Sequence, residues 1–343
     1  MNTKSINLKK VLTDNAIIIF LVILVTYTSL TKANFFAGSN FSNIVMNVSV
    51  RFIMALGVSG ALITRGTDLS AGRLAGLSGV IAATMLQRAD YADRFPLMDK
   101  WTTSFLIGNP MLKVVIVFLL VVTVCMLFGL INGIVISKFH VPPFLATLGM
   151  QTIVYGANQV YSGSMPIGGL MNEYTNISNG YFFEIFQFKF SYLFLIALII
   201  GSIMWFLYNM TRHGKYMYAI GGNEIAAEVS GVNVSFVLIR IYALAGLLYG
   251  IAGFLLGGRA GGASVNLGTG YELEAIAACT IGGVSTSGGI GKIRGILSGV
   301  LVYELLKTSM QYLGINPSWQ FVAQGVVIIV AVALDIKKYT RKK

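Results

Sequence analysis

Charged side chains are scarce in this sequence. Only 11% of its 343 residues are Asp, Glu, Lys or Arg, whereas 55% are hydrophobic, and the mean hydropathy is +0.75. A soluble domain of this size needs a charged exterior, and the long uncharged stretches leave no residues with which to build one. The composition therefore excludes an ordinary soluble domain and indicates a chain whose main solvent is the lipid bilayer.

Cysteine is almost absent, and so are the motifs of catalysis. The two cysteines, Cys125 and Cys279, lie in separate apolar stretches without a CxxC pair or a histidine cluster. The sequence therefore indicates neither a disulfide framework nor a metal site. It also contains no nucleophile elbow and no HExxH motif. We expect a chain that is not an enzyme.

Acidic residues are half as common as basic ones, 13 against 25, and the net charge is +12. The basic residues form no face with interleaved aromatic side chains, as a nucleic-acid-binding surface would. They lie mostly at the ends of apolar runs, where the positive-inside rule holds Lys and Arg on the cytoplasmic side of a membrane. Membrane topology therefore explains the charge, and we expect no nucleic acid partner.

Apolar runs long enough to cross a bilayer recur along the whole chain. They predict an all-α membrane protein, a single transmembrane domain over residues 1–343 with about ten helices, at 15–31, 41–64, 69–87, 112–136, 143–161, 190–209, 236–257, 272–290, 295–313 and 318–335. Lys and Arg are more numerous in the loops on the side of the N-terminus, which predicts cytoplasmic N- and C-termini. The loop 210–235 and the basic tail 336–343 are then cytoplasmic, and the long loops 88–111 and 162–189 are outside.

Glycine is abundant and recurs at helical spacing. Four pairs lie four residues apart: Gly72 and Gly76, Gly129 and Gly133, Gly246 and Gly250, and Gly295 and Gly299. Small residues at this spacing let membrane helices approach closely. The pairs predict four faces of tight helix packing.

The loop at residues 218–234 contains the strongest local helix signals outside the apolar runs. Asn223 is a good N-cap, Glu224 favours a first helical turn, and Gly231 is a good terminator. A helix from Glu224 to Ser230 is therefore predicted, far too short to span a membrane. It is either a simple turn between two spans or a docking helix for a cytoplasmic partner.

Three segments together carry a family resemblance. Residues 66–72 read Gly-Thr-Asp-Leu-Ser-Ala-Gly, residues 275–291 fit the pattern A-A-x-x-x-G-G-x-S-x-x-G-G-x-G, and residues 218–234 form the loop just described. With the P-F-x-x-T-L-G motif in residues 141–149, they resemble the sugar permeases of bacterial ABC importers, the ribose, xylose and galactose type. The resemblance runs from about residue 40 to the C-terminus. Thr67, Asp68, Arg73 and the segments 271–278 and 316–320 are more similar to the galactose and methyl-galactoside branch than to the ribose branch.

This resemblance implies a type II importer permease fold with broken or re-entrant glycine-rich segments, in a bacterial inner membrane. Two copies would form one sugar pathway, with a cytoplasmic ATPase subunit below and a periplasmic sugar-binding protein above. The chain has no Walker A motif, since its nearest approach at 288–292 lacks a glycine at 286 and has Ile293 where Ser or Thr would hold magnesium. We therefore expect no cofactor on this chain and expect the partner ATPase to use ATP and magnesium.

The resemblance also implies roles for three sets of residues. The coupling helix to the ATPase would comprise Gly221, Gly222, Asn223, Glu224, Ala226, Ala227, Ser230 and Gly231. The pathway or its gate would be lined by Phe144, Thr147, Met150, Gln151, Trp319, Gln320 and Gln324. A structural motif would comprise Gly66, Asp68, Ser70, Gly72, Gly282, Gly283, Gly288, Gly289 and Gly291.

Ionisable residues inside apolar runs need separate explanations, because charges are costly in a bilayer. We expect Asp68 to cap the helix that begins near Leu69 rather than to contact sugar, and Arg73 to lie near the inner interface. Glu304 and Lys307 have the spacing of an ion pair within one helix.

Two further charges and one segment complete this set. Glu272 and Glu274 are expected to stabilise a helix N-terminus. The stretch 281–291 is expected to be a second broken helix, the counterpart of 66–72.

Two other functions remain open on the sequence. An ion-coupled secondary sugar transporter could use Asp68 or Glu304, and a non-transporting scaffold or membrane enzyme would need chemistry for which no motif is present. An ABC permease for another small solute, such as ribose or xylose, is the nearest variant of the first interpretation.

Overall fold

The computed structural model describes residues 16–88 and 109–340. The helices are α2 (Ala16–Thr31), α3 (Gly38–Ile63), α4 (Ala71–Met85), α6 (Pro110–Lys138), α7 (Pro143–Ser162), α8 (Asn172–Asn179), α9 (Tyr192–Met210), α10 (Arg212–Gly222), α11 (Glu224–Val229), α12 (Val234–Ala260), α13 (Tyr271–Ile281), α14 (Ile293–Tyr312) and α15 (Pro317–Thr340). One antiparallel hairpin joins β1 (Tyr181–Ile185) to β2 (Phe188–Ser191).

Four described helices, α3, α6, α9 and α12, are long and apolar enough to cross a membrane. Shorter apolar helices lie within α2, α4 and α15. Each of the ten predicted runs overlaps a helix, so the largely helical prediction is confirmed in outline. The prediction of an all-α chain is wrong at 162–189, where α8 and the β-hairpin occupy the loop.

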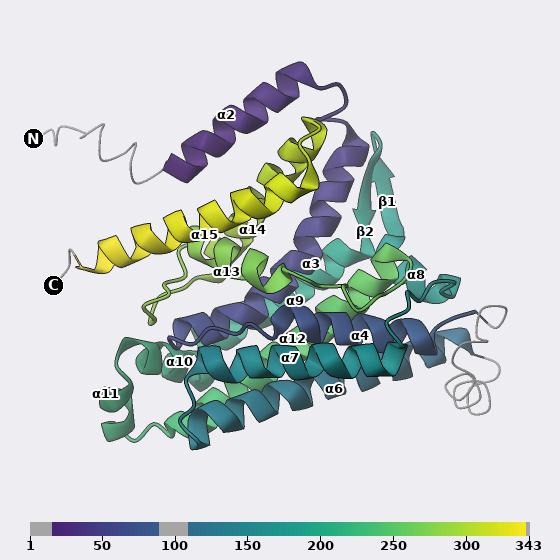
Figure 1. Cartoon of the computed structure of the whole chain (residues 1–343). Coiled ribbons are helices and arrows are strands. Elements are labelled where there is room, and N and C mark those ends of the chain that lie inside the picture. The colour runs from purple at the N-terminus through teal and green to yellow at the C-terminus, as the bar shows by residue number, and fades with distance from the viewer. Residues whose placement is uncertain (1–15, 89–108, 341–343) are drawn as a thin grey trace, which may run out of the picture.

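The helices form two groups that α3 joins (Figure 1). One group is built on α12, which packs against α6 and α4, with α7 lying on α4 and α6. The other consists of α2, α13, α14 and α15. Helices α10 and α11 lie at one end of the molecule, called here the α11 side, and α8 and the hairpin lie at the other, the hairpin side (Figure 1). The described ends of α2 and α15 that adjoin the two termini lie toward the α11 side.

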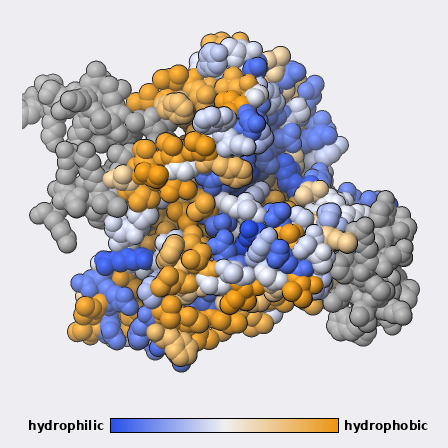
Figure 2. Space-filling view, viewed as in Figure 1, coloured by the Kyte–Doolittle hydropathy of each residue, from blue (hydrophilic) through white to orange (hydrophobic). Residues whose placement is uncertain are grey.

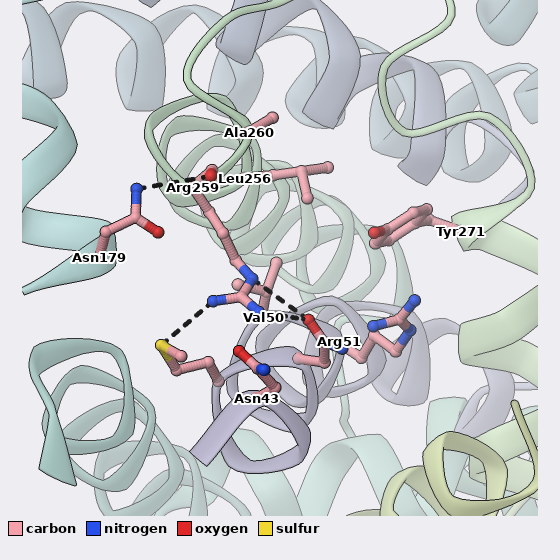
Figure 3. Close-up of a pocket in the computed structure, with 10 residues that line it drawn as sticks. Asn43, Val50, Arg51, Asn179, Leu256, Arg259, Ala260 and Tyr271 are labelled. Carbon is pink, nitrogen blue, oxygen red and sulfur yellow. Dashed lines mark hydrogen bonds between the residues drawn. The ribbon is translucent and has the colours of Figure 1, made fainter. Parts of the chain in front are cut away.

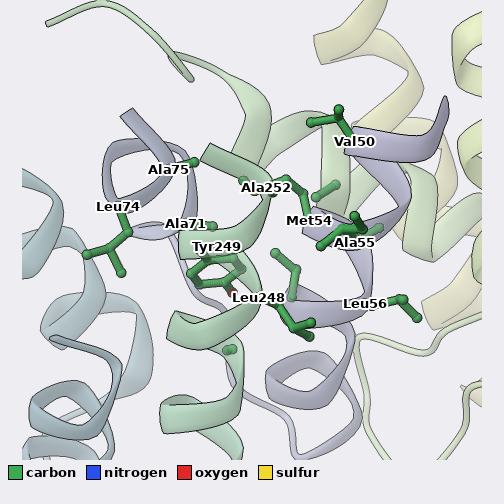
Figure 4. Packing of buried hydrophobic residues seen from close by; sticks show 14 of the residues in the cluster. Val50, Met54, Ala55, Leu56, Ala71, Leu74, Ala75, Leu248, Tyr249 and Ala252 are labelled. Atoms are coloured by element: carbon green, nitrogen blue, oxygen red, sulfur yellow. The ribbon is translucent and has the colours of Figure 1, made fainter. Parts of the chain in front are cut away.

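The core lies where α3, α4 and α12 meet. Figure 4 shows Tyr249 of α12 between Ala71, Leu74 and Ala75 of α4 on one side and the α3 side chains around Ala55 on the other. Tyr249 is fully buried, and a methyl group at Gly57 of α3 would overlap its ring. A bulky aromatic side chain thus fits because the facing helix has no side chain there.

Glycine also sets the contact between α6 and α12. A Cβ atom at Gly246 would meet the carbonyl oxygen of Cys125, and one at Gly129 would meet that of Tyr242. Glycine at these positions lets the two backbones touch, which confirms the close packing predicted from the spacing. The pair in α14 is confirmed in the same way, since it packs against the C-terminal end of α13, whereas the pair in α4 packs closely against the loop 267–268 rather than against a helix.

The predicted span at 272–290 is wrong as a single helix. Helix α13 has 11 residues, which is about 16 Å of rise, and it ends at Ile281. Before it, the loop 261–270 leaves the hairpin side, where Ala263 pairs with Ile167, and reaches Gly72 at the start of α4. This re-entrant loop and α13 together replace one spanning helix, as occurs in transporters with discontinuous helices.

The break predicted at 281–291 is therefore misplaced. Residues 282–292 form a glycine-rich turn between α13 and α14 on the α11 side, where Gly289 contacts Gly222. The break inside the layer of helices is the loop 261–270. The first break is placed correctly, since residues 64–70 separate α3 from α4.

Enlarging Gly246 to leucine should separate α6 from α12, because the new side chain would overlap the Cys125 carbonyl. We expect Gly246→Leu to lower the free energy of unfolding by about 1–3 kcal/mol, measured by thermal unfolding of the protein in nanodiscs. The matched control is Gly156→Leu on α7, where a Cβ atom meets nothing within 4 Å. Equal losses in both variants would contradict the close-packing interpretation.

Candidate functional site

The short helix predicted in the loop 218–234 is confirmed as α11. The side-chain oxygen of Asn223 accepts a hydrogen bond from the backbone N–H of Ala226 at 3.0 Å, and Gly231 follows with φ of 84°. Ile225 and Val229 are four residues apart on this helix and are 75% and 84% exposed. Two exposed aliphatic side chains on one face of a helix at the end of the molecule form an apolar surface suited to a partner.

The sequence reasoning missed Ile225 and Val229 among the residues of this helix. Their i, i+4 spacing was the available signal, since residues at that spacing share a helix face. Of the predicted set, Ala227 is buried, while Gly222, Asn223 and Glu224 are exposed.

Helix α10 leads directly into α11. Its C-terminal end packs against the turn after α3 and against the glycine-rich turn 282–292. Arg65, in the turn after α3, donates from Nε to the carbonyl oxygen of Gly221 at 2.8 Å and from Nη2 to that of Gly222 at 2.6 Å. The backbone N–H of Gly289 donates to the carbonyl oxygen of Ile63 at 2.8 Å. A Cβ atom at Gly221 would overlap the Ile63 carbonyl oxygen. We call this contact of residues 63–65, 221–222 and 288–291 the coupling junction.

A tyrosine strengthens the coupling junction. The Tyr218 hydroxyl donates to the carbonyl oxygen of Gly291 at 2.8 Å, so α10 is hydrogen-bonded to the turn 282–292. At the start of α10, His213 is buried, and burial together with the nearby Arg240 lowers its pKa from the ordinary value. Its imidazole is therefore neutral at pH 7.

Asp68 lies in the first break, residues 64–70, where its side chain is buried and hydrogen-bonded. One carboxylate oxygen accepts from the backbone N–H of Ser70 at 2.9 Å and from its hydroxyl at 2.6 Å, and the other accepts from the Tyr249 hydroxyl at 3.1 Å. Asn132 of α6 donates to the Ser70 hydroxyl oxygen at 3.0 Å. Helix α4 begins at Ala71 with Ser70 at its N-cap and has no side-chain cap hydrogen bond, so the predicted cap of a helix beginning near Leu69 is wrong. Asp68 instead fixes the turn before the helix by accepting from Ser70.

The predicted pathway residues fall into two groups by exposure. Thr147, Met150 and Gln324 are buried, and the Thr147 hydroxyl accepts from the backbone N–H of Leu69 at 3.1 Å and so braces the first break. Phe144 and Trp319 are 52% and 62% exposed. Gln151 and Gln320 are half-buried. The pathway role of this set stays a prediction.

A cluster of four charged side chains joins α3, α13 and α14. Arg51 Nε lies 2.7 Å from a Glu274 carboxylate oxygen, and Arg51 Nη1 lies 3.0 Å from one of Glu304. Lys307 Nζ lies 2.9 Å from the other Glu274 oxygen. The predicted pairing of Glu304 with Lys307 is thus wrong, because each side chain finds its partner on another helix. Buried charges of this kind are retained only when they are paired.

A polar cavity of about 400 Å³ lies beside this cluster, on the hairpin side. Figure 3 shows Arg259 of α12 reaching in from above, with Tyr271 on one side and Asn179 of α8 on the other. Arg259 donates from Nη2 to the Asn47 side-chain oxygen at 2.9 Å, and the Asn47 amide donates to Glu304 at 2.7 Å. The cavity wall and the ion cluster are therefore one hydrogen-bonded network.

The described residues contain no group of three His, Cys, Asp or Glu side chains that could hold a metal ion. The polar groups instead anchor helices to one another, and the exposed apolar surface of α11 faces away from them. This arrangement, with several apolar helices and two broken segments, is that of a multi-pass membrane permease.

Comparison with known proteins agrees with this class. A model of the family described as the branched-chain amino acid transport system / permease component matches residues 40–332, and the chain belongs to this permease family. The galactose/methyl galactoside import permease protein MglC of Haemophilus influenzae is 44% identical over 344 residues, covering 99% of this chain and 98% of the relative. The Escherichia coli K12 protein of the same name is 43% identical over 346 residues, covering 99% of each.

A second group of relatives is more distant. The ribose import permease protein RbsC of Haemophilus influenzae is 32% identical over 344 residues, covering 99% of this chain and 98% of the relative. No solved structure matches the chain. The order of similarity agrees with the resemblance drawn from the sequence motifs.

Removal of Arg51 should destabilise the protein strongly, because Glu304 would keep a buried charge without its cation. We expect Arg51→Met to cost about 3–5 kcal/mol of folding free energy, seen as a lower thermal midpoint in detergent. Adding Glu304→Gln should restore part of the loss. Wild-type stability of the single variant would show that the cluster does not hold α3 to α14.

Proposed function

We propose that this chain is the membrane-spanning translocation subunit of an ATP-driven ABC importer, and that its cargo is a monosaccharide, galactose or methyl galactoside. The printed names of the two most similar relatives given above supply the substrate class. The alternative cargo is ribose, after the more distant relatives. The chain binds no nucleotide itself, and a separate ATPase subunit hydrolyses ATP with magnesium.

The proposed topology is that of a type II importer permease in the bacterial inner membrane, a single domain with about ten spans. The α11 side is cytoplasmic and the hairpin side is periplasmic, with both termini in the cytoplasm. A second copy of the chain completes the pathway. The ATPase binds α11, and a periplasmic sugar-binding protein delivers sugar at the hairpin side.

The single observation that carries this proposal is the coupling junction. Helix α10 leads directly into α11, which offers exposed apolar side chains to a partner, and α10 is bound to the turn after α3 through the carbonyls of Gly221 and Gly222. The end of α3 is itself hydrogen-bonded to residues 282–292, between α13 and α14. Displacement of α11 by a partner therefore moves the turn after α3 and the turn 282–292 together, since packed backbones transmit displacement rather than absorb it.

Reconstitution tests the function itself. Vesicles containing the permease, the ATPase subunit and the sugar-binding protein should accumulate labelled galactose against a gradient when ATP is supplied inside the compartment that holds the ATPase. Uphill uptake without the ATPase subunit, abolished by an ionophore, would overturn the proposal in favour of an ion-coupled transporter.

The coupling junction predicts different effects at two adjacent glycines. Gly221→Ala would push a methyl group into the Ile63 carbonyl oxygen, whereas Gly222 has nothing within 4 Å of an added Cβ atom. We expect Gly221→Ala to reduce uptake roughly tenfold while ATP hydrolysis persists, and Gly222→Ala to resemble the wild type. Identical behaviour of the two variants would remove the junction from the mechanism.

The ATPase contact predicts a cross-link. Glu224→Cys lies on the exposed side of α11 and should cross-link to the ATPase subunit, with a yield that changes when nucleotide binds. Phe186→Cys at the tip of the hairpin, 95% exposed, is the control for the opposite side. Cross-links from Glu224→Cys only to periplasmic proteins would invert the topology.

A further inference from the structure

The guanidinium of Arg73 on α4 lies over an aromatic ring. Its guanidinium carbon lies 4.2 Å from the ring centre of Tyr155 on α7, and Nη1 donates to the Val265 carbonyl oxygen at 3.1 Å and to the Thr269 hydroxyl at 3.0 Å. Among the described residues, no group accepts a hydrogen bond from Nε or Nη2, and no carboxylate forms an ion pair with Arg73. The side chain is fixed in place, yet three of its five N–H donors remain unused.

The depth of Arg73 differs from the sequence-based expectation. Tyr155 lies 12 residues beyond Pro143, the first residue of the 20-residue helix α7, which corresponds to about 18 Å of rise from the α11 side. Arg73 therefore lies near the middle of the helical layer. The predicted position near the inner interface is wrong.

Polar groups of the re-entrant loop surround the guanidinium. Thr269 and Asn266 are exposed, and Gln324 of α15 donates to the carbonyl oxygen of Gly270 at 3.3 Å. Glu272, the second residue of α13, is buried close enough to Arg73 to feel its charge, and one of its oxygens has no hydrogen-bond partner. Arg73 of α4 thus links the loop 261–270 to Tyr155 of α7. Gln324 links the same loop to α15.

One face of the molecule carries hydrophilic surface between two apolar regions. Figure 2 shows apolar surface over α2 and α15 at the top and over α6 and α7 at the bottom, with hydrophilic surface between them. A cation facing lipid at mid-membrane costs about 2.5–3.5 kcal/mol even on insertion scales. We therefore expect partly exposed Arg73 and exposed Thr269 to face water rather than hydrocarbon.

The chemistry around Arg73 suits a neutral polyhydroxylated solute. Three unused guanidinium donors and the side chains of Thr269 and Asn266 offer hydrogen bonds to hydroxyl groups. The charge of Arg73 is opposed by nearby Glu272, so a free anion gains little there. Stacking on Tyr155 fixes the direction of the donors before any ligand arrives, which lowers the entropic cost of binding.

We propose that Arg73, Tyr155 and Thr269 form a sugar-contacting site at mid-membrane, where the unused N–H groups of Arg73 bind hydroxyls of the monosaccharide as it passes. The site rests on the proposed function, because it takes its ligand from that assignment. Arg73 is then a specificity-determining residue of the pathway, and its stacking partner and the re-entrant loop position it.

The first test compares two stacked arginines. In the complete reconstituted complex, Arg73→Gln should reduce galactose uptake about tenfold, the loss expected for hydrogen bonds to a charged group, while ATP hydrolysis stays near the wild-type rate. Arg73→Lys should recover part of the uptake. The control is Arg240→Gln, an exposed arginine on α12 that lies over Phe236, and uptake should be unchanged.

Two outcomes of this test overturn the proposal. One is wild-type uptake by Arg73→Gln. The other is parallel loss of uptake and ATP hydrolysis with a lower thermal midpoint, which makes the role of Arg73 structural. Failure of the wild-type complex to import galactose would instead count against the proposed function, and the second test below does not depend on it.

The second test asks whether water reaches the site. In membrane vesicles, Thr269→Cys should react with a charged, membrane-impermeant thiol reagent, because a thiolate forms only where water is present. Ile199→Cys on the apolar face of α9, 51% exposed, should not react, and the natural Cys125 and Cys279 are fully buried. An unreactive Thr269→Cys would show that lipid or a second copy covers the site, and would overturn the proposal.

Discussion

The hydrogen bond between the Gly289 N–H and the Ile63 carbonyl is the contact on which the mechanical account depends. It joins the end of α3 to the glycine-rich turn 282–292, and Gly221 packs against it without a side chain to separate the backbones. A single displacement of α10 therefore acts on α3, α4, α13 and α14 at once. The Arg65 guanidinium fixes the same end of α10 by two charge-assisted hydrogen bonds, which are the stronger kind.

The buried ion cluster complements the coupling junction within the helical layer, since Arg51 lies halfway along α3. Arg51 holds α3 to α13 and α14, and Asn47 extends the network to Arg259 of α12. The two helix groups are thus joined within the layer by charges and at the α11 side by backbone contacts. The re-entrant loop 261–270, to which Arg73 donates, leads directly into α13 and its ion cluster.

Local sequence signals predicted the local structure well. The Asn223 cap, the proline start of α7 and three of the four glycine pairs each depend on residues within one or two turns, so their spacing alone was sufficient. Non-local pairings were not accessible in this way. Lys307 has a carboxylate three residues away, yet it pairs with Glu274 on another helix, because the packing of α13 against α14 decides which charges meet. The stacking of Arg73 on Tyr155 likewise joins residues far apart in the sequence.

The second helix break could not be located from the sequence for a different reason. The apolar residues of α13 run on into the glycine-rich turn that follows, so hydropathy cannot separate a half-helix and a turn from one span. The glycines at 282–291 look like a break but form the turn of the coupling junction. Only the contact of Gly268 with Gly72 shows where the chain re-enters the layer.

The measurement that tests the central claim most directly is a set of spin-label distances in the assembled complex, with and without nucleotide. Labels at Glu228→Cys on α11 and Ile290→Cys in the turn 282–292 report the coupling junction, and a label at Phe186→Cys on the hairpin supplies the reference. The account predicts that the distance from 228 to 290 stays constant while both distances to 186 change together. A change in the distance from 228 to 290, with the turn fixed relative to the hairpin, would contradict it.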